Sequence, residues 1–180
     1  MTPTDHRWPP NDPVGAAVTT GAPAVEPSAG VERWRPAVDD PVVVARFVGF
    51  VHRSPGCWWW TGALSSCGHG RFWVRAGLVV IAHRFAYALA HPDAALPEVL
   101  AHTCDESSCQ KPAHLAPSDP DDNRAQWVAR RSTPGSPLRD TRGARGRAAA
   151  VRAALRTGGD ASASAAAGAP AVDAGQGSLW

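Results

Sequence analysis

The sequence predicts a small α+β domain between two low-complexity tails. Its 180 residues are enough for one modest domain with extensions. Ile, Leu, Val and Phe are concentrated between about residues 42 and 100, so the core is small. Short β-branched or aromatic runs alternate with helical patterns within residues 39–132, which we take as the domain. Residues 1–38 and 133–180 are rich in Pro, Ala and Gly, and we expect them to be mostly disordered.

The first half of the domain predicts a helix and then strands. "DDPVVVARFVGFVHR", residues 39–53, has an acidic start, an early proline and apolar residues at helical spacing, although its valine run keeps a strand open. "GCWWWTG" predicts a strand between glycines, and the turn "SSCGHG" follows it. "RFWV" and "LVVIA" then predict a hairpin through Arg75–Gly77.

The second half predicts a helix, a strand, a loop and a final helix. "AHRFAYALAHP" is helical in pattern and is stopped by Pro92. "LPEVLAHTC" predicts a short strand that runs into "DESSCQKPAHL". "SDPDDNRAQWVARR" predicts a helix with Ser118 as N-cap, acids in the first turn and arginines in the last. The domain therefore closes with a strand, a ligand-rich loop and a helix.

Charge is distributed unevenly along the chain. The formal net charge is only +2, but nine arginines and one acid, Asp140, lie between Arg124 and Arg156. A basic arm of this kind favours a polyanion such as nucleic acid, and a solubilising tail is the alternative. Within it, residues 145–156 have the alanine content of a short helix that forms mainly on a partner.

The amino-terminal residues predict no secretion signal. They lack an apolar segment of the required length, and no run approaches the roughly 18 apolar residues of a membrane span. We therefore expect a cytoplasmic protein and no membrane partner. In that reducing compartment, four cysteines are metal ligands or free thiols more often than disulfides.

Cys104, Cys109 and His114 predict a zinc loop. Thiolate and imidazole are the ligands of tetrahedral Zn²⁺, and short gaps let one loop surround the ion. A structural site takes four ligands, so one comes from elsewhere. Cys57 and Cys67 are the candidates, and we favour Cys57 because it opens a strand. Free or disulfide-bonded thiols are the alternative.

His102 remains unassigned by this zinc set. It lies two residues before Cys104, so a fourth-ligand or supporting role is one interpretation. The other is a general base, because neutral imidazole accepts a proton from water near pH 7. Asn123, in the following helix, has an oxygen that suits Mg²⁺, although a plain helical residue is the commoner reading. A histidine base beside Mg²⁺ is sufficient apparatus for phosphodiester hydrolysis.

Four motifs in order resemble one enzyme family. "AHTCDESSCQKPAHLAPSDPDDN" is similar to the zinc-stapled branch of the HNH endonucleases, which includes the His-Cys box homing endonucleases and many phage and bacterial proteins. "GCWWWTG", "GHGRFWV" and "AHRFAYALAHP" match the strands and helix that precede it there. The resemblance spans about residues 40–132. It implies a ββα-metal (His-Me finger) nuclease domain.

The resemblance also implies residue roles. His102 is expected to be the general base, Asn123 the ligand of a catalytic Mg²⁺ or similar ion, and Arg71 the residue that steadies the phosphate. Structural zinc is expected on Cys57, Cys104, Cys109 and His114. Lys111 replaces the family's usual asparagine and is a candidate phosphate contact. The further DNA-binding candidates are His83, Arg84, Arg124, Arg130 and Arg131.

These expectations combine into a metal-dependent DNA endonuclease, bacterial or phage-encoded, acting on double-stranded DNA. A homodimer is left open. One alternative is a non-catalytic, zinc-stapled DNA-binding module. Another is a small zinc interaction domain with "CWWW" as an exposed aromatic patch. Against that patch, Trp58 and Trp60 of a strand share one side and Trp59 the other, so at least one face is expected in the core.

Overall fold

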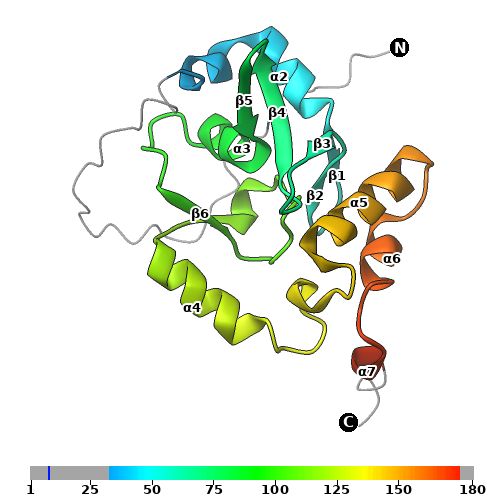
Figure 1. Cartoon of the computed structure of the whole chain (residues 1–180). Coiled ribbons are helices and arrows are strands. Elements are labelled where there is room, and N and C mark those ends of the chain that lie inside the picture. Colours follow the sequence, from blue (N-terminus) through cyan, green and yellow to red (C-terminus); the bar gives the residue numbers. More distant parts are fainter. Residues whose placement is uncertain (1–7, 9–32, 175–180) are drawn as a thin grey trace.

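Three small antiparallel sheets and the helices around them form the described part of the chain, residue 8 and residues 33–174, in this computed structural model (Figure 1). The elements, in chain order, are η1 (Arg35–Asp39), α2 (Pro41–Val48), β1 (Val51–Arg53), β2 (Trp58–Trp60), β3 (Ala63–Leu64), β4 (Gly70–Arg75), β5 (Leu78–Ile81), α3 (Ala82–Ala90), β6 (Val99–His102), η2 (Pro112–His114), β7 (Leu115–Ser118), α4 (Pro120–Arg130), η3 (Pro137–Arg139), α5 (Gly143–Arg156), α6 (Ala161–Ala166) and α7 (Ala171–Ala174). The sheets are β1–β2, β3–β4–β5 and β6–β7. The fold is therefore mixed α and β, as the sequence predicts.

Helix α2 is shorter than the segment 39–53 expected to form it. The Asp40 carboxylate caps its start by accepting a hydrogen bond from the Val42 N–H at 2.9 Å. The helix ends at Gly49, and the chain then pairs as β1 with β2, His52 opposite Trp59. The expected helix is thus correct for its first part and wrong for its end, because pairing with the tryptophan strand competes for residues 51–53.

The expected hairpin of β4 and β5 is present. Gly77 turns the chain at φ 70°, a left-handed value that favours glycine. Along β4, buried and exposed side chains alternate, so Phe72 and Val74 point inward while Arg71 points outward.

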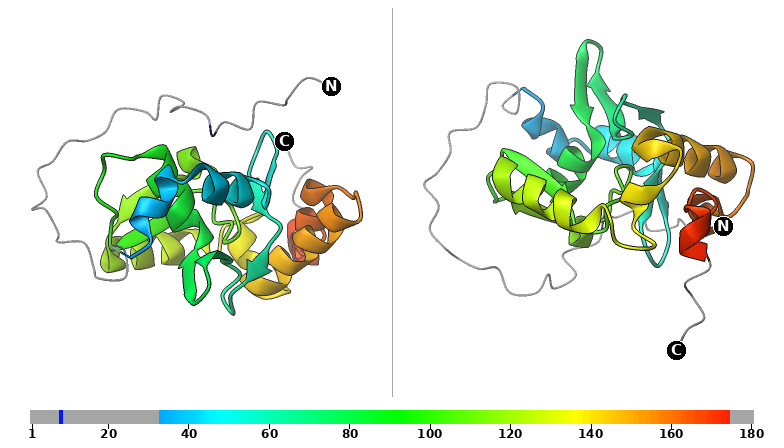
Figure 2. Two further views of the ribbon diagram at one scale, coloured as in Figure 1. Left: turned by 90° about the horizontal axis from the view of Figure 1, so that it is seen from above. Right: turned by 60° about the horizontal axis from the view of Figure 1, so that its bottom comes forward.

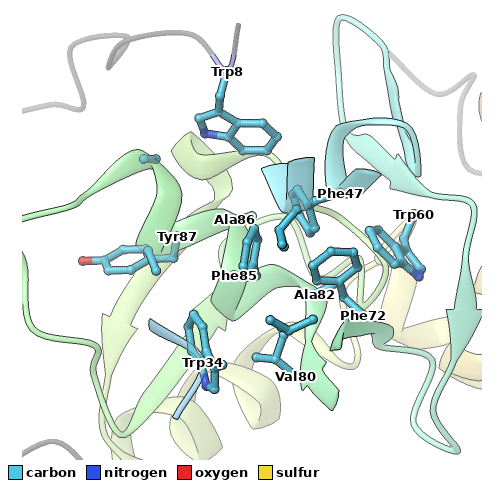
Figure 3. Packing of buried hydrophobic residues seen from close by; sticks show 14 of the residues in the cluster. Trp8, Trp34, Phe47, Trp60, Phe72, Val80, Ala82, Phe85, Ala86 and Tyr87 are labelled. Atoms are coloured by element: carbon cyan, nitrogen blue, oxygen red, sulfur yellow. The ribbon is translucent and has the colours of Figure 1, made fainter. Parts of the chain in front are cut away.

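An aromatic core lies between α2, α3 and the strands (Figure 3). Phe47 is fully buried, and its ring centroid stands 4.8 Å from that of Phe85 and 5.1 Å from that of Phe72. Trp8 and Trp34 also belong to this cluster, at 7 % and 5 % exposure. Both come from the segment 1–38 expected to be disordered. That expectation is wrong for these two residues and for η1, and otherwise lies outside the described residues.

The strand, loop and helix order at the end of the predicted domain is confirmed. β6 pairs with β7, His102 opposite Leu115, and α4 follows directly. The N-cap of α4 is Asp119 rather than Ser118, because the Asp119 carboxylate accepts from the Asp122 N–H at 2.8 Å. Helix α4 buries none of its residues and contacts β6.

The segment after residue 132 folds back onto the domain rather than remaining disordered. Helices α5 and α6 pack on each other, and α5 also contacts β2 and β3 (Figures 1 and 2). Val151, Ala161 and Ala165 cover Trp59, which is 4 % exposed. The small alanine side chains let α5 and α6 approach each other closely, and Trp59 contributes most of the apolar area that is buried there. The expectation of disorder was wrong because these helices are stabilised by packing on Trp59, which lies about ninety or more residues earlier in the sequence.

Ion pairs fasten the same segment. Arg147 forms a bidentate pair with buried Glu106 and donates to Asp140 at 3.2 Å. Burial alone raises the pKa of Asp140, but hydrogen bonds from Arg142 and Arg147 outweigh it and bring that pKa to about 2. Asp140 is therefore ionised between the two arginines at neutral pH.

Helices across the described ranges are too short or too polar to cross a membrane.

Candidate metal centre and adjoining pocket

Cys57, Cys104, Cys109 and His114 come together, although Cys57 is distant from the others in sequence. Their ligand atoms all lie within 4.8 Å of one another. His114 Nδ1 stands 3.7 Å from Cys57 Sγ and 3.6 Å from Cys109 Sγ. In a tetrahedral zinc site with Zn–S bonds of about 2.3 Å and Zn–N bonds of about 2.1 Å, sulfur and nitrogen stand about 3.6 Å apart. The group is a candidate site for a metal ion such as zinc.

Backbone pairing positions these ligands. The loop after β6 lies along β2, where the Trp60 N–H donates to Ser108 O at 3.0 Å and the Gln110 N–H to Trp58 O at 2.7 Å. Cys109 is thereby held beside the strand that Cys57 precedes. Asp105 turns the loop after Cys104 at φ 57°, a left-handed conformation that Asp tolerates better than most residues. The short helix η2 then presents His114.

Cys57 and Cys109 differ in acidity. Hydrogen bonds from Cys104 and Cys57 lower the pKa of Cys109 to about 4. Hydrogen bonds with Cys104 and Cys109, together with burial, raise the pKa of Cys57. Three thiolates this close repel one another, and a divalent cation removes that repulsion. Cys67 is exposed and is not part of the group, in line with the preference for Cys57.

Lys111 braces this loop instead of pointing to solvent. Its Nζ donates to the carbonyl oxygens of Pro55 and Gly56, both at 3.1 Å, directly before Cys57. These two bonds use two of the three N–H groups of the Lys111 ammonium, so Lys111 supports the loop, and the phosphate contact expected of it stays a prediction.

An open pocket of about 340 Å³ adjoins the metal group. Both residues expected to do chemistry, His102 and Asn123, line it. His102 Nε2 lies 3.0 Å from the carbonyl oxygen of Cys109. A carbonyl only accepts, so Nε2 carries the proton and Nδ1 has the free lone pair. Burial lowers the pKa of His102, which favours the neutral ring.

Two further histidines join His102, and one of them was missed in the sequence. The ligand nitrogens of His69, His83 and His102 lie within 4.8 Å of one another. Burial lowers the pKa of His69 to about 4 and that of His83 well below its usual value. The signal for His69 was its place in "GHGRF", directly before β4. From there its ring lies beside that of His83 on α3, with the centroids 5.1 Å apart.

Other predicted site residues lie elsewhere. Arg71 stacks over Trp73 at 5.2 Å and lines a different surface pocket, so the structure does not bring it to His102. Arg84 donates to the carbonyl oxygens of Pro97 at 2.9 Å and Glu98 at 3.1 Å. Arg84 therefore supports the chain before β6, and its role as a DNA contact stays a prediction.

The arginines of α4 differ in availability. Arg124 is exposed and lines the pocket. Arg130 also lines it but is paired with Asp105 at 3.2 Å and donates to Thr103 O at 3.2 Å. Arg131 is exposed and lies over the Trp127 ring at 4.7 Å. Two of the three are thus free to meet a ligand.

Comparison with known proteins finds two relatives from Escherichia phage T7. Protein 2.8 is 35% identical over 89 residues, which are 48% of this chain and 60% of that protein. Protein 7.7 is 35% identical over 74 residues, 41% of this chain and 56% of that protein. The chain therefore spans less than two thirds of either relative, and neither name states an activity. No family model and no solved structure matches.

Proposed function

We propose that this chain is a metal-dependent DNA endonuclease of the HNH type, with a ββα-metal domain stapled by zinc. The observation that carries the proposal is the placement of His102 and Asn123 on one open pocket, directly beside the Cys₃His group. The order β6, ligand loop, β7 and α4 supports the same assignment. The phage relatives are compatible with it but state no activity.

His102 is the general base in this proposal. The Cys109 carbonyl holds its Nε2–H, which fixes the ring and leaves Nδ1 to take the proton of an attacking water. Because Cys109 also supplies a sulfur to the metal group, the staple and the base are joined through one residue. A zinc ion held by Cys57, Cys104, Cys109 and His114 would fix the loop whose Cys109 carbonyl orients His102.

Asn123 is the proposed ligand of the catalytic ion. Asn123 and Asp105 both line the pocket, and their side chains carry an amide oxygen and a carboxylate. Oxygen donors suit Mg²⁺, which would retain waters and bind the scissile phosphate. When bound, the ion would stabilise the charge that develops on the phosphate and on the leaving oxygen. Asp105 is held by Arg130, so Asn123 is the freer of the two donors.

Arg124 and Arg131 are the proposed contacts to the DNA backbone. Both are exposed, Arg124 within α4 and Arg131 as its C-cap, and Arg124 lines the pocket. A planar guanidinium suits phosphate oxygens. The exposed ring of Trp127 on the same helix adds a surface for a base or sugar.

A nicking assay tests the proposal. Supercoiled plasmid is incubated with Mg²⁺ and either wild type, His102→Ala or Asn123→Ala. We expect wild type to relax the plasmid, EDTA to stop it, and each variant to lose roughly a hundredfold or more in rate. Matched controls are His52→Ala, an exposed histidine on β1, and Gln126→Ala, an exposed amide on α4.

Equal nicking by all five proteins would rule out this active site. If the folded wild type bound plasmid in a salt-sensitive way but never nicked any DNA tested, the non-catalytic DNA-binding module would replace the proposal. The zinc interaction domain is less favoured, because Trp59 and Trp60 are 4 % and 1 % exposed and form no surface patch.

A further inference from the structure

Three imidazole rings meet beside the pocket, each from a different part of the chain; His69 and His102 line the pocket and His83 is buried behind it. His69 directly precedes β4, His83 lies in the first turn of α3, and His102 ends β6. The ring centroids are 5.1 Å apart for His69 and His83, 4.6 Å for His83 and His102, and 5.9 Å for His69 and His102. Three elements that are far apart in the sequence thus bring their histidines to one point.

The spacing is that of ligands around one ion. A Zn–N bond of about 2.1 Å puts an imidazole centroid about 3.2 Å from the ion, so tetrahedral neighbours have centroids about 5.2 Å apart. The three observed separations bracket this value. The nitrogens, within 4.8 Å of one another, need to approach to about 3.4 Å when an ion binds.

The rings also have lone pairs without partners. His83 is 6 % exposed, and its Nδ1 is buried without a hydrogen bond to any described residue. An unpaired buried polar atom is destabilising, and coordination to a metal would remove that cost. His102 has Nδ1 free, because its Nε2 donates to Cys109 O. Neutral imidazole is the form that binds metals, and burial lowers the pKa of His69 to about 4 and that of His83 well below its usual value.

We propose that His69, His83 and His102 form a second metal site, which takes a borderline transition ion such as Zn²⁺, Co²⁺ or Ni²⁺. Three nitrogen donors suit these ions, whereas Mg²⁺ prefers oxygen. The site is separate from the Cys₃His group in its ligands and opens to the pocket of about 340 Å³. The fourth position is left for water or for an oxygen of a bound molecule.

One consequence rests on the proposed endonuclease function. An ion on the histidines occupies the lone pair with which His102 would take a proton. Excess Zn²⁺ is therefore expected to inhibit Mg²⁺-dependent nicking, and His69→Ala to relieve that inhibition. The existence of the site itself does not depend on DNA cleavage.

Cobalt titration of the whole chain tests the site. The Cys₃His group gives intense thiolate-to-Co²⁺ bands in the near ultraviolet, whereas a three-histidine site gives only weaker visible bands. We expect wild type to bind two equivalents, one of each kind. His69→Ala should retain the thiolate bands, which report that the protein is folded, and should bind the second equivalent at least about a hundredfold more weakly.

His52→Ala, a histidine outside both groups, is the matched control and should bind like wild type. Cys67→Ser alters the thiol that lines the pocket without belonging to either group, and it should also bind two equivalents. If His69→Ala fails to show the thiolate bands, His69→Gln takes its place. A wild type that binds one equivalent, or a second equivalent that survives in both His69 variants, would overturn the second site. Loss of that equivalent in Cys67→Ser but not in His69→Ala would do the same. None of these outcomes alters the result of nicking in Mg²⁺ alone, so the two proposals fail separately.

Discussion

Arg147 connects two acids that come from different parts of the chain. It pairs with Glu106 in the metal loop and with Asp140 ahead of α5, and both acids are buried. Burial outweighs Arg147 at Glu106 and raises the pKa of that carboxyl, so Glu106 depends on the arginine to remain ionised. The pair thus ties the carboxyl-terminal helices to the loop that carries the metal ligands.

Arg147→Ala should destabilise the protein strongly. Removing one partner of a buried pair leaves an uncompensated charge, which costs roughly 3–5 kcal/mol. Arg145→Ala, an exposed arginine on the same helix, should change the free energy of unfolding by less than about 0.5 kcal/mol. Urea denaturation followed by tryptophan fluorescence measures both. Similar decreases in the free energy of unfolding in the two variants would show that the buried ion pair does not stabilise the protein more than an exposed arginine does.

The loop between β6 and β7 is the element on which the proposed site depends. It is short of apolar residues, and its shape comes from backbone pairing with β2 and from the Cys₃His group. A structural zinc ion supplies roughly 10–16 kcal/mol of apparent binding free energy, which is comparable with the whole stability of a small domain.

Cys109→Ser should therefore unfold the metal loop and the domain with it. Far-ultraviolet circular dichroism and thermal melting after complete zinc removal should show the same loss in the wild type. Cys67→Ser, which alters the exposed thiol outside the group, should melt like wild type. An unchanged melting temperature after verified metal removal would mean that the ion, if bound, is not structural.

Elements with a local signal could be predicted, and those fixed by distant contacts could not. The Cys104, Cys109 and His114 spacing predicted the loop, and Gly77 marked the hairpin. The third histidine was missed because "GHG" resembles any turn, and only the approach of α3 and β6 gives His69 its partners. Helix α5 was expected to form only when bound to a partner. Its alanine content does not reveal that it packs on Trp59 of the same chain.

At the scale of the whole molecule, folding of the carboxyl-terminal segment changes which charges face solvent. Of the nine arginines expected to form a basic arm, five are engaged with acids or backbone carbonyls. These are Arg130, Arg139, Arg142, Arg147 and Arg152. Nucleic-acid affinity is therefore expected to come from few side chains, with those on α4 nearest the pocket.

Salt dependence of DNA binding checks this distribution. With Mg²⁺ replaced by Ca²⁺ to avoid cleavage, Arg124→Ala and Arg131→Ala should each reduce the slope of log K against log salt by about 0.9. Arg156→Ala is the control, since it removes an exposed arginine at the end of α5, away from α4 in both views (Figures 1 and 2). If the salt-dependence slope fell most for Arg156→Ala, the DNA-binding surface would have to be assigned to α5 instead of α4.

The packing of Val151, Ala161 and Ala165 on Trp59 has a consequence for the chain while it is being translated. Ala161 and Ala165 are made roughly a hundred residues after the tryptophan that they bury. At roughly 5–20 residues per second, that interval lasts on the order of ten seconds. Once Cys104 and Cys109 have also been made, the nascent chain presents an uncovered indole beside these cysteines until the last helices follow. The newborn protein is thus most vulnerable to association and to thiol oxidation just before its last helices leave the ribosome.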